Sequence, residues 1–392
     1  MQQNVLILMN IIKSEILQTE FDPSAFLSLS DAQQQELAAL AKQQSVAQLL
    51  GDALGKNPAT KDLPITQKLF KETMLSLNYT SRIETEREKI CCILEESGIE
   101  YMPLKGARIR SYYPHAWMRS SCDNDILVHE TDLDQAVALL NEKLDCDVGE
   151  KSVHDIPLTS KSSATLELHF NLDSHSETMN RVLDQVWNAE NICKTEGSCQ
   201  VLQSNEFFLF YLISHLANHI LGGGCGFRPV IDLYLLFQRM PFDENQLKLL
   251  CRQAGIEPLY EHIRSLISIW FENGSHTQAT QRLEDFLLSS DTYGSQKNHI
   301  AVVQQRYGNK MGGISYRVFL PMKKLRKMYP VLDSRPWLIP VCQVRRWGRL
   351  IFKKRYKKSC PISIRCTVWI QNTLHPHSSC SEKMDLITVN FI

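Results

Sequence analysis

The sequence predicts an α+β protein in which a small mixed β-sheet is flanked by helical N- and C-terminal regions. Apolar residues recur at helical spacing up to about residue 85 and again from about residue 204. Between these regions, strand, helix, strand, helix and hairpin patterns follow one another. The 392 residues, of which 43% are hydrophobic and 22% charged, are enough for two or three ordinary globular domains.

We divide the chain into four regions. They are a helical N-terminal region (1–85), the region that holds the predicted sheet (86–195), a second helical region (196–328) and a Pro-containing, basic C-terminal segment (329–392). In the first region we expect four helices. The first covers residues 1–13, the second begins at the cap-type pair Ser30-Asp31, the third begins near Ala47, and the fourth covers 66–84. These helices are expected to serve as packing elements.

The region 86–195 begins with an expected helix, 86–97, that ends at Gly98, a residue type common just after a helix. The next elements are predicted in order as a strand at 99–104, a helix from Lys105 toward Tyr113, a strand at 123–128, a helix at 131–143 and a hairpin of 152–158 with 164–170. This succession predicts a small mixed sheet backed by helices.

The second helical region is expected to contain helices at 205–220, 229–240, 243–254, 259–270 and 280–288. The glycine cluster 222–226 follows a helix and not a strand, so it predicts a hinge or an interhelical turn and not a dinucleotide-binding loop. We also expect an ion pair between Arg228 and Asp232, which lie on opposite sides of Pro229.

The overall charge does not indicate a polyanionic partner, because the 43 basic and 43 acidic residues cancel. Local charge is different in residues 345–358, which include eight basic residues and three aromatic ones. This stretch has the composition to bind RNA or a membrane surface, but a solvated segment is the favoured interpretation. Nucleic acid is therefore not a favoured partner.

The sequence also predicts a cytoplasmic protein. The N-terminus lacks both the basic region and the cleavage site of a secretory signal, and no stretch approaches the roughly 20 apolar residues of a membrane span. The 12 cysteines are scattered without a Cys-x-x-Cys motif, which favours free thiols in a reducing compartment.

Asp123 and Asp125 are the strongest candidates for chemistry. They lie two positions apart at the start of the predicted strand 123–128, so both side chains project from one face of the sheet and can hold a hard cation such as Mg²⁺ or Mn²⁺. Glu167 lies on another predicted strand with His169 on the same face, and adds a third acid. Three acids this close stay ionised only where cations neutralise them. A purely structural alternative, with Asp123 capping a turn and Glu167 on a solvated edge, stays open.

These residues carry a resemblance to a known family. Leu104-Lys-Gly106, Tyr113-Pro114, Arg119, the strand 123–128 and Glu167-Leu-His169 resemble the uncharacterised nucleotidyltransferase family of the DNA polymerase β-like superfamily. The similarity continues through His215-Leu-Ala-Asn-His219, residues 228–232 and residues 329–346, and so covers about 65 to about 355.

The resemblance implies an enzyme that transfers a nucleoside monophosphate from a nucleoside triphosphate to an acceptor hydroxyl, with pyrophosphate leaving. Asp123 and Asp125 would hold two Mg²⁺ ions, and Glu167 would complete one site and help accept the proton of the hydroxyl. The residues implied for nucleotide binding are Lys105, Gly106, Arg108, Arg119, His169, His215 and His219. The acceptor is a small molecule, a sugar or a protein.

Two residues depart from the family pattern. Gly106-Ala107 replaces a Gly-Ser pair, so a hydroxyl contact to phosphate is lost and Lys105 is its expected substitute. Asn124 replaces an apolar residue that faces the helices beneath the sheet, where an unpaired amide costs roughly 1–3 kcal/mol. These departures leave open an alternative, a catalytically silent nucleotide-binding or scaffold protein. His215 and His219, four apart on one helix, are not favoured as a zinc pair because no third ligand is evident.

Overall fold

The computed structural model describes residues 2–121, 123–160, 165–174, 176–289, 322–329 and 331–352. The chain divides into two compact units, Met1–His299 together with Asn390–Ile392, and Ile300–Val389, and each is described by itself. The α+β prediction is confirmed for the first unit, which combines a five-stranded mixed sheet with many helices. The predicted boundaries near residues 85 and 195 lie inside this unit and stay a prediction.

The N-terminal region is helical, as predicted. Its first four helices are α1 (Gln2–Leu17), α2 (Ser24–Leu27), α3 (Asp31–Gln43) and α4 (Ala47–Lys56). The Ser30 side chain caps α3 and forms a capping box with Gln33, which explains why this helix starts where the cap-type residues predict.

The next helix, α5 (Pro64–Glu96), is a single element of 33 residues, so the prediction of two helices separated near residue 85 was wrong. No glycine or proline follows Pro64 within α5, and the charged stretch that obscures its apolar pattern consists of helix formers. Ion pairs from Arg87 to Glu84 (2.8 Å) and from Lys89 to Glu86 (3.0 Å) connect successive turns there. Gly98 follows the helix with φ 67°, as expected.

The main sheet has the strand order β1-β2-β5-β4-β3. Its strands are β1 (Tyr101–Pro103), β2 (Asp123–Val128), β3 (Asp147–Val148), β4 (Asp155–Thr159) and β5 (Thr165–His169). The pair β2 and β5 is parallel, and the other neighbours are antiparallel. The predicted strand 123–128 and the predicted hairpin, now β4 and β5, are confirmed, whereas β3 and the separate pair β6 (Ile192–Lys194) and β7 (Val201–Gln203) were not predicted.

Short helices connect these strands. They are α6 (Gly106–Ile109), η1 (Arg110–Tyr112), η2 (Ala116–Met118), η3 (Glu130–Asp132), α7 (Leu133–Leu144), α8 (Glu177–Leu183) and η4 (Ala189–Asn191). The helix expected from Lys105 is only α6 continued by η1, because Pro114 disfavours helical backbone in the residue before it.

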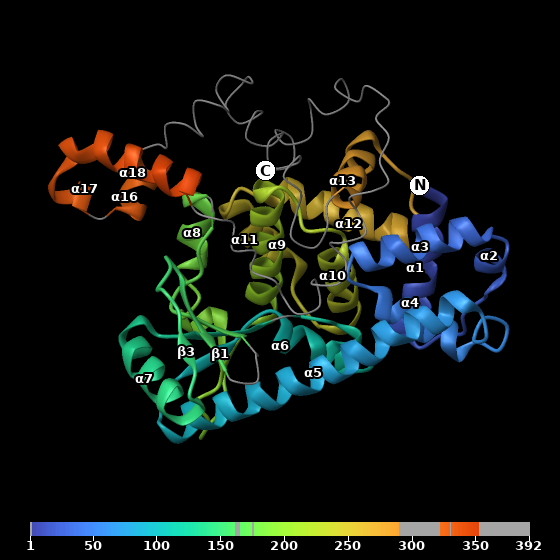
Figure 1. The fold of residues 1–392 in the computed structure, drawn as a ribbon, viewed down its shortest axis with the longest axis horizontal. Helices are drawn as coiled ribbons and strands as arrows, with labels where there is room; N and C mark the ends of the chain where they lie inside the picture. Colours follow the sequence, from blue (N-terminus) through green and yellow to red (C-terminus); the bar gives the residue numbers. More distant parts are fainter. Residues whose placement is uncertain are drawn as a thin grey trace. The chain divides into compact units, whose positions relative to one another are not determined.

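One face of the sheet forms the hydrophobic core of this region. Ile126, Leu166 and Leu168 are buried there in one cluster with Leu94 of α5 and Leu140 of α7. Figure 1 shows the long helix α5 running beneath the sheet toward α7. Because side chains alternate along a strand, the residues between these apolar positions project from the opposite face.

Residues 205–289 of the first unit are mostly helical, as predicted: α9 (Asn205–Gly222), α10 (Arg228–Arg239), α11 (Glu244–Gln253), α12 (Glu257–Phe271) and α13 (Gln278–Leu288). The glycine cluster is the turn between α9 and α10. Gly223, Gly224 and Gly226 have φ values of 115°, 101° and 72°, a backbone conformation that glycine adopts without a steric penalty.

The described part of the second unit contains α16 (Met322–Met328), α17 (Val331–Ser334), η5 (Pro336–Leu338) and α18 (Ile339–Phe352). Leu325, Tyr329, Leu332 and Cys342 form its small core. The basic stretch 345–358 begins in α18 and continues outside the described residues, as does the whole segment 359–392.

Two further expectations concern the described residues. None of the helices in this part of the chain is long and apolar enough to cross a membrane. The described cysteines, eight of the 12, are free thiols, as their spacing predicts.

Candidate active site

The structure brings the predicted acids together on one sheet face. Asp125 of β2 lies directly opposite Glu167 of β5, and Leu127 lies opposite His169. The face that carries Asp123, Asp125, Glu167 and His169 is therefore the face turned away from the core. Asp125, Glu167 and His169 each present one ligand atom, and these atoms all lie within 4.8 Å of one another.

Asp125 is the most constrained of these acids. Its side chain is 5% exposed, and its Oδ1 accepts hydrogen bonds from Lys105 Nζ and His169 Nε2, both at 2.9 Å. Burial acts to raise the pKa of Asp125, but the charge of Lys105 and the bonded imidazole outweigh burial and hold this pKa well below its usual range. Asp125 is thus an anion at neutral pH.

The other two acids are less well compensated. Burial and the charge of Asp125 raise the pKa of Asp123. Burial together with Asp125 and Asp123 raises the pKa of Glu167 to about 7. The site therefore has more carboxylates than nearby positive charge satisfies, which is the electrostatic condition for binding a cation.

The turn from β1 into α6 faces these acids through Lys105. The backbone of Lys105 has φ 37° and ψ −109°, which is unusual for a residue with a side chain. Gly106 follows at the start of α6, and a Cβ placed on it would lie 2.9 Å from Arg119 Nη1 and 3.1 Å from Arg110 Nη1. A larger residue here would have to displace a guanidinium group that lies against the turn.

Arg119 is held in this position by the C-terminal half of the unit. Its Nε donates to Asp232 Oδ1 at 3.0 Å, its Nη2 lies 3.0 Å from Asp232 Oδ2, and Tyr113 Oη donates to the same carboxylate at 2.8 Å. The predicted ion pair between Arg228 and Asp232 is therefore wrong. Arg228 Nη1 instead donates to the carbonyl oxygen of Ser120 at 2.9 Å, and Arg119 takes the carboxylate.

Arg108 is not gathered with the acids. Its Nη1 donates to the Gln203 carbonyl and its Nη2 to Asn205 Oδ1, both at 2.6 Å, and the guanidinium lies 4.3 Å from the centre of the Phe208 ring. These contacts connect α6 to β7 and to the start of α9. Both terminal nitrogens are already bonded to protein atoms.

Helix α9 contributes Tyr211, His215 and His219, spaced one turn apart. The two imidazole rings are 4.4 Å apart and nearly perpendicular. Burial, followed by the charges of Lys105 and His219, puts the pKa of His215 well below its ordinary value, so this imidazole is neutral. Within the described residues, the only group of three or more metal-ligand side chains is Asp125, Glu167 and His169, and it does not include the α9 histidines.

Sequence reasoning missed Tyr211. Burial raises the pKa of its hydroxyl, while the charge of Lys105 lowers this pKa and the charge of Asp125 raises it. The signal was present in the sequence, because Tyr211 precedes His215 by four residues and so shares its face of the helix. It also missed His154, whose ring lies 5.6 Å from the His169 ring in a stacked arrangement.

Asn124 lies on the opposite face, as predicted. Its Nδ2 donates to the Ile83 carbonyl of α5 at 3.1 Å, while its Oδ1 is buried without a hydrogen-bond partner. This polar side chain does not touch the acidic site, and its unpaired oxygen is a cost to stability.

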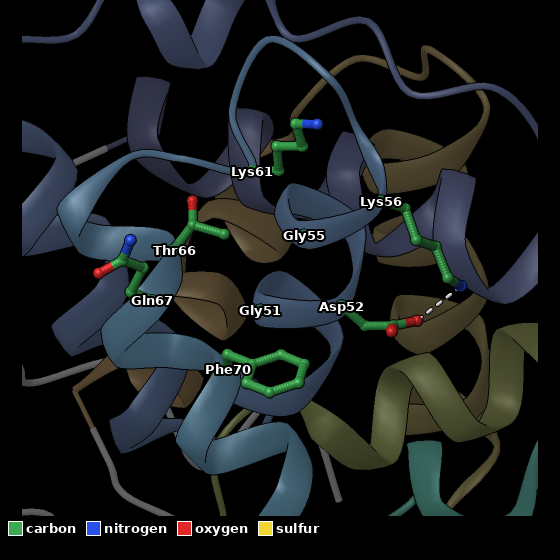
Figure 2. Close-up of a pocket in the computed structure, with 8 residues that line it drawn as sticks. All are labelled: Gly51, Asp52, Gly55, Lys56, Lys61, Thr66, Gln67 and Phe70. Carbon is green, nitrogen blue, oxygen red and sulfur yellow. Dashed lines mark ion pairs between the residues drawn. The ribbon is translucent and has the colours of Figure 1, made fainter.

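A separate cavity of about 460 Å³ lies in the N-terminal helical region, between α4 and the start of α5 (Figure 2). Asp52 and Lys56 pair at its edge at 2.6 Å, and Lys56 also binds the buried Glu15. The residues that line this cavity are Gly51, Asp52, Gly55, Lys56, Lys61, Thr66, Gln67 and Phe70, and none of them belongs to the predicted site.

A sheet face that presents paired acids beside a glycine turn is the arrangement expected for nucleotide chemistry. The model of the family described as uncharacterised nucleotidyltransferase matches residues 30–272. This match spans more than half of the 392 residues, so the chain belongs to that family and is an enzyme of the nucleotidyltransferase class.

Among solved structures, the chain is similar to the solution structure of the antibiotic-resistance factor ANT(2'')-Ia, with 12% sequence identity. The similarity covers 50% of this chain and 93% of that one, with a TM-score of 0.27. No curated protein matches the sequence.

Proposed function

We propose that this enzyme transfers a nucleoside monophosphate from a nucleoside triphosphate to a hydroxyl of a small molecule, a sugar or a protein, with release of pyrophosphate and with dependence on Mg²⁺ or Mn²⁺. The observation that carries the proposal is the register of β2 and β5, which places Asp125 opposite Glu167 with Asp123 two residues away. The family to which the chain belongs supports the type of reaction.

The donor atoms of the site fit such a cation. Asp125 and Glu167 offer carboxylate oxygens, which Mg²⁺ and Mn²⁺ prefer, and His169 adds an imidazole that also suits Mn²⁺. Asp123 is not in this group of three, but it lies two residues from Asp125 on the same strand face and adds a further carboxylate. When bound, the cation supplies charge stabilisation at the entering and leaving oxygens of phosphoryl transfer.

The chain's own residues have three further roles in the proposal. Lys105 and the backbone at Gly106 bind the triphosphate, because the ammonium and the glycine turn lie on the side of the acids. Glu167 accepts the proton of the acceptor hydroxyl, because its carboxylate lies opposite Asp125 on the face that would hold the cation. His215, a neutral and half-buried imidazole whose pKa the charge of Lys105 helps to lower, contacts the nucleotide from α9.

The proposal is tested with purified protein, Mg²⁺ or Mn²⁺, each α-labelled nucleoside triphosphate in turn, and pools of sugars, small alcohols and proteins as acceptors. Pyrophosphate release and label transfer are measured together. We expect Asp125→Asn and Glu167→Gln to reduce both by at least about a hundredfold, whereas Glu142→Gln, at an exposed position on α7, should not change them. Equal rates for wild type and Asp125→Asn would refute the proposal, and nucleotide binding without turnover would indicate a silent nucleotide-binding protein.

A further inference from the structure

We infer that Lys105 is an internal counter-ion that competes with the divalent cation for Asp125 and is released to the triphosphate, so that nucleotide and cation bind cooperatively. The inference rests on the proposed function and adds a regulation of the same site: the nucleotide controls access of the cation to its ligands.

The first observation is that Asp125 Oδ1 already has two partners. Lys105 Nζ and His169 Nε2 both lie 2.9 Å from this oxygen, and a carboxylate oxygen has about two lone-pair directions. His169 Nε2 also lies 3.9 Å from Glu167 Oε2. The ammonium thus lies among the same side chains that offer ligand atoms to a cation, and like charges repel strongly at such distances in a poorly solvated site.

The second observation concerns the other nearby cations. Arg119 is bonded to Asp232, and Arg110 lies 2.6 Å from Glu84. Arg228, whose charge also acts on Asp123, donates to the Ser120 carbonyl at 2.9 Å. Among the described lysines and arginines, Lys105 is the one that forms an ion pair with Asp125. A change in the position of Lys105 therefore changes the charge balance of the acids, whereas the arginines keep partners of their own.

The third observation is the backbone of Lys105. Its φ of 37° with ψ of −109° is a conformation that side-chain-bearing residues adopt only when the surrounding structure enforces it. In this conformation the ammonium is paired with Asp125. Because Lys105 is part of the turn proposed to receive the triphosphate, phosphate oxygens can replace Asp125 as the partner of the ammonium.

These observations lead to a thermodynamic expectation. Without nucleotide, the cation must compete with Lys105 and binds weakly. With nucleotide, the ammonium has a phosphate partner and the full charge of Asp125 becomes available. Linkage requires that the nucleotide increase cation affinity by the same factor by which the cation increases nucleotide affinity.

The test measures free Mn²⁺ by electron paramagnetic resonance during titration of the whole chain, with and without a non-reactive α,β-methylene nucleoside triphosphate. The Mn²⁺ that the analogue itself holds, measured in the same titration without protein, is subtracted. Analogues of ATP, GTP, CTP and UTP are used in separate titrations. Wild type is compared with Lys105→Gln, and with Lys143→Gln, which removes the same charge from an exposed position at the end of α7. Without nucleotide, we expect Lys105→Gln to bind Mn²⁺ at least about tenfold more tightly than wild type and Lys143→Gln.

With nucleotide present, we expect that advantage to disappear, because wild type then gains affinity and the variant gains less. Equal Mn²⁺ affinity of wild type and Lys105→Gln without nucleotide would overturn the inference alone. Absence of Mn²⁺ binding in every protein, with and without nucleotide, would overturn the proposed function and the inference with it.

A variant that fails to fold does not remove the test. Wild type alone must bind Mn²⁺ at least about tenfold more tightly with an analogue than without one, and unchanged affinity overturns the inference. Lys105→Arg retains the charge, so it should keep the weak nucleotide-free affinity of wild type. A gain in affinity as large as that of Lys105→Gln would contradict a role for charge.

Discussion

Removal of the Asp232 carboxylate should destabilise the protein more than any surface change of the same size. The side chains of Arg119 and Asp232 are 8% and 4% exposed, and the carboxylate accepts from Arg119 and from Tyr113. Asp232→Ala leaves the guanidinium buried without a counter-charge and the Tyr113 hydroxyl without its acceptor. The expected loss of unfolding free energy is about 3–5 kcal/mol, the cost typical of breaking one side of a buried ion pair.

Equilibrium urea unfolding followed by circular dichroism measures this change. Glu257→Ala is the matched control, because it breaks the Arg252–Glu257 pair of 2.6 Å on the surface, where solvent screens the charges, and it should barely move the unfolding midpoint. The double variant Arg119→Met/Asp232→Leu removes both charges and should lose less stability than Asp232→Ala alone. An Asp232→Ala midpoint like that of the surface control, or a double variant that loses as much stability as Asp232→Ala, would refute this expectation.

Three further outcomes follow from the same contacts. Gly106→Ala should reduce nucleotide affinity by about tenfold or more in a protein that still folds, because the new methyl group would lie 2.9 Å from Arg119 Nη1 and must displace either this guanidinium or the turn. Unchanged affinity in a fluorescent-nucleotide titration would contradict the proposed location of the phosphate site. Asn124→Leu should raise the unfolding free energy by about 1 kcal/mol, since it removes the unpaired buried Oδ1, and a loss of stability on urea unfolding would show that the bond to the Ile83 carbonyl matters more. Mn²⁺ affinity, measured by calorimetry, should rise with pH up to about 7 and then level off, because the cation must displace the proton that Glu167 retains below its pKa of about 7; Glu167→Gln should flatten this profile, and an equally steep profile in that variant would assign the proton to another group.

The acidic strand illustrates what the sequence predicts well. The strand 123–128 has acids at alternate positions followed by apolar residues, and its bounds in the structure are those expected. The hairpin of β4 and β5 was likewise visible, because the alternation in residues 165–169 separates an apolar face from Glu167 and His169. Local periodicity was sufficient in both cases, and parallel pairing of β2 with β5 then placed Glu167 beside Asp125.

Other features depend on long-range contacts that local patterns do not contain. Arg119 and Asp232 are 113 residues apart, and the sequence instead suggested a local pair between Arg228 and Asp232. The strands β3, β6 and β7 have only two or three residues each, too few for a period-two pattern to emerge. The positive φ of Lys105 could not be predicted either. A glycine at this position would have suggested a positive φ, but a lysine does not.

The helices of the C-terminal half are part of the candidate active site and not a separate support. Asp232 of α10 pairs with Arg119, Arg108 bonds to β7 and α9, and His215 of α9 is close enough to Lys105 for that charge to lower its pKa. A guanidinium left in the interior without its carboxylate is costly, so residues 86–195 without α10 would have to move Arg119 into solvent and away from Gly106. The sheet supplies the acids, but the position of the guanidinium behind the phosphate turn depends on a helix more than a hundred residues further along the chain. The family model that matches residues 30–272 likewise covers both the sheet and α10.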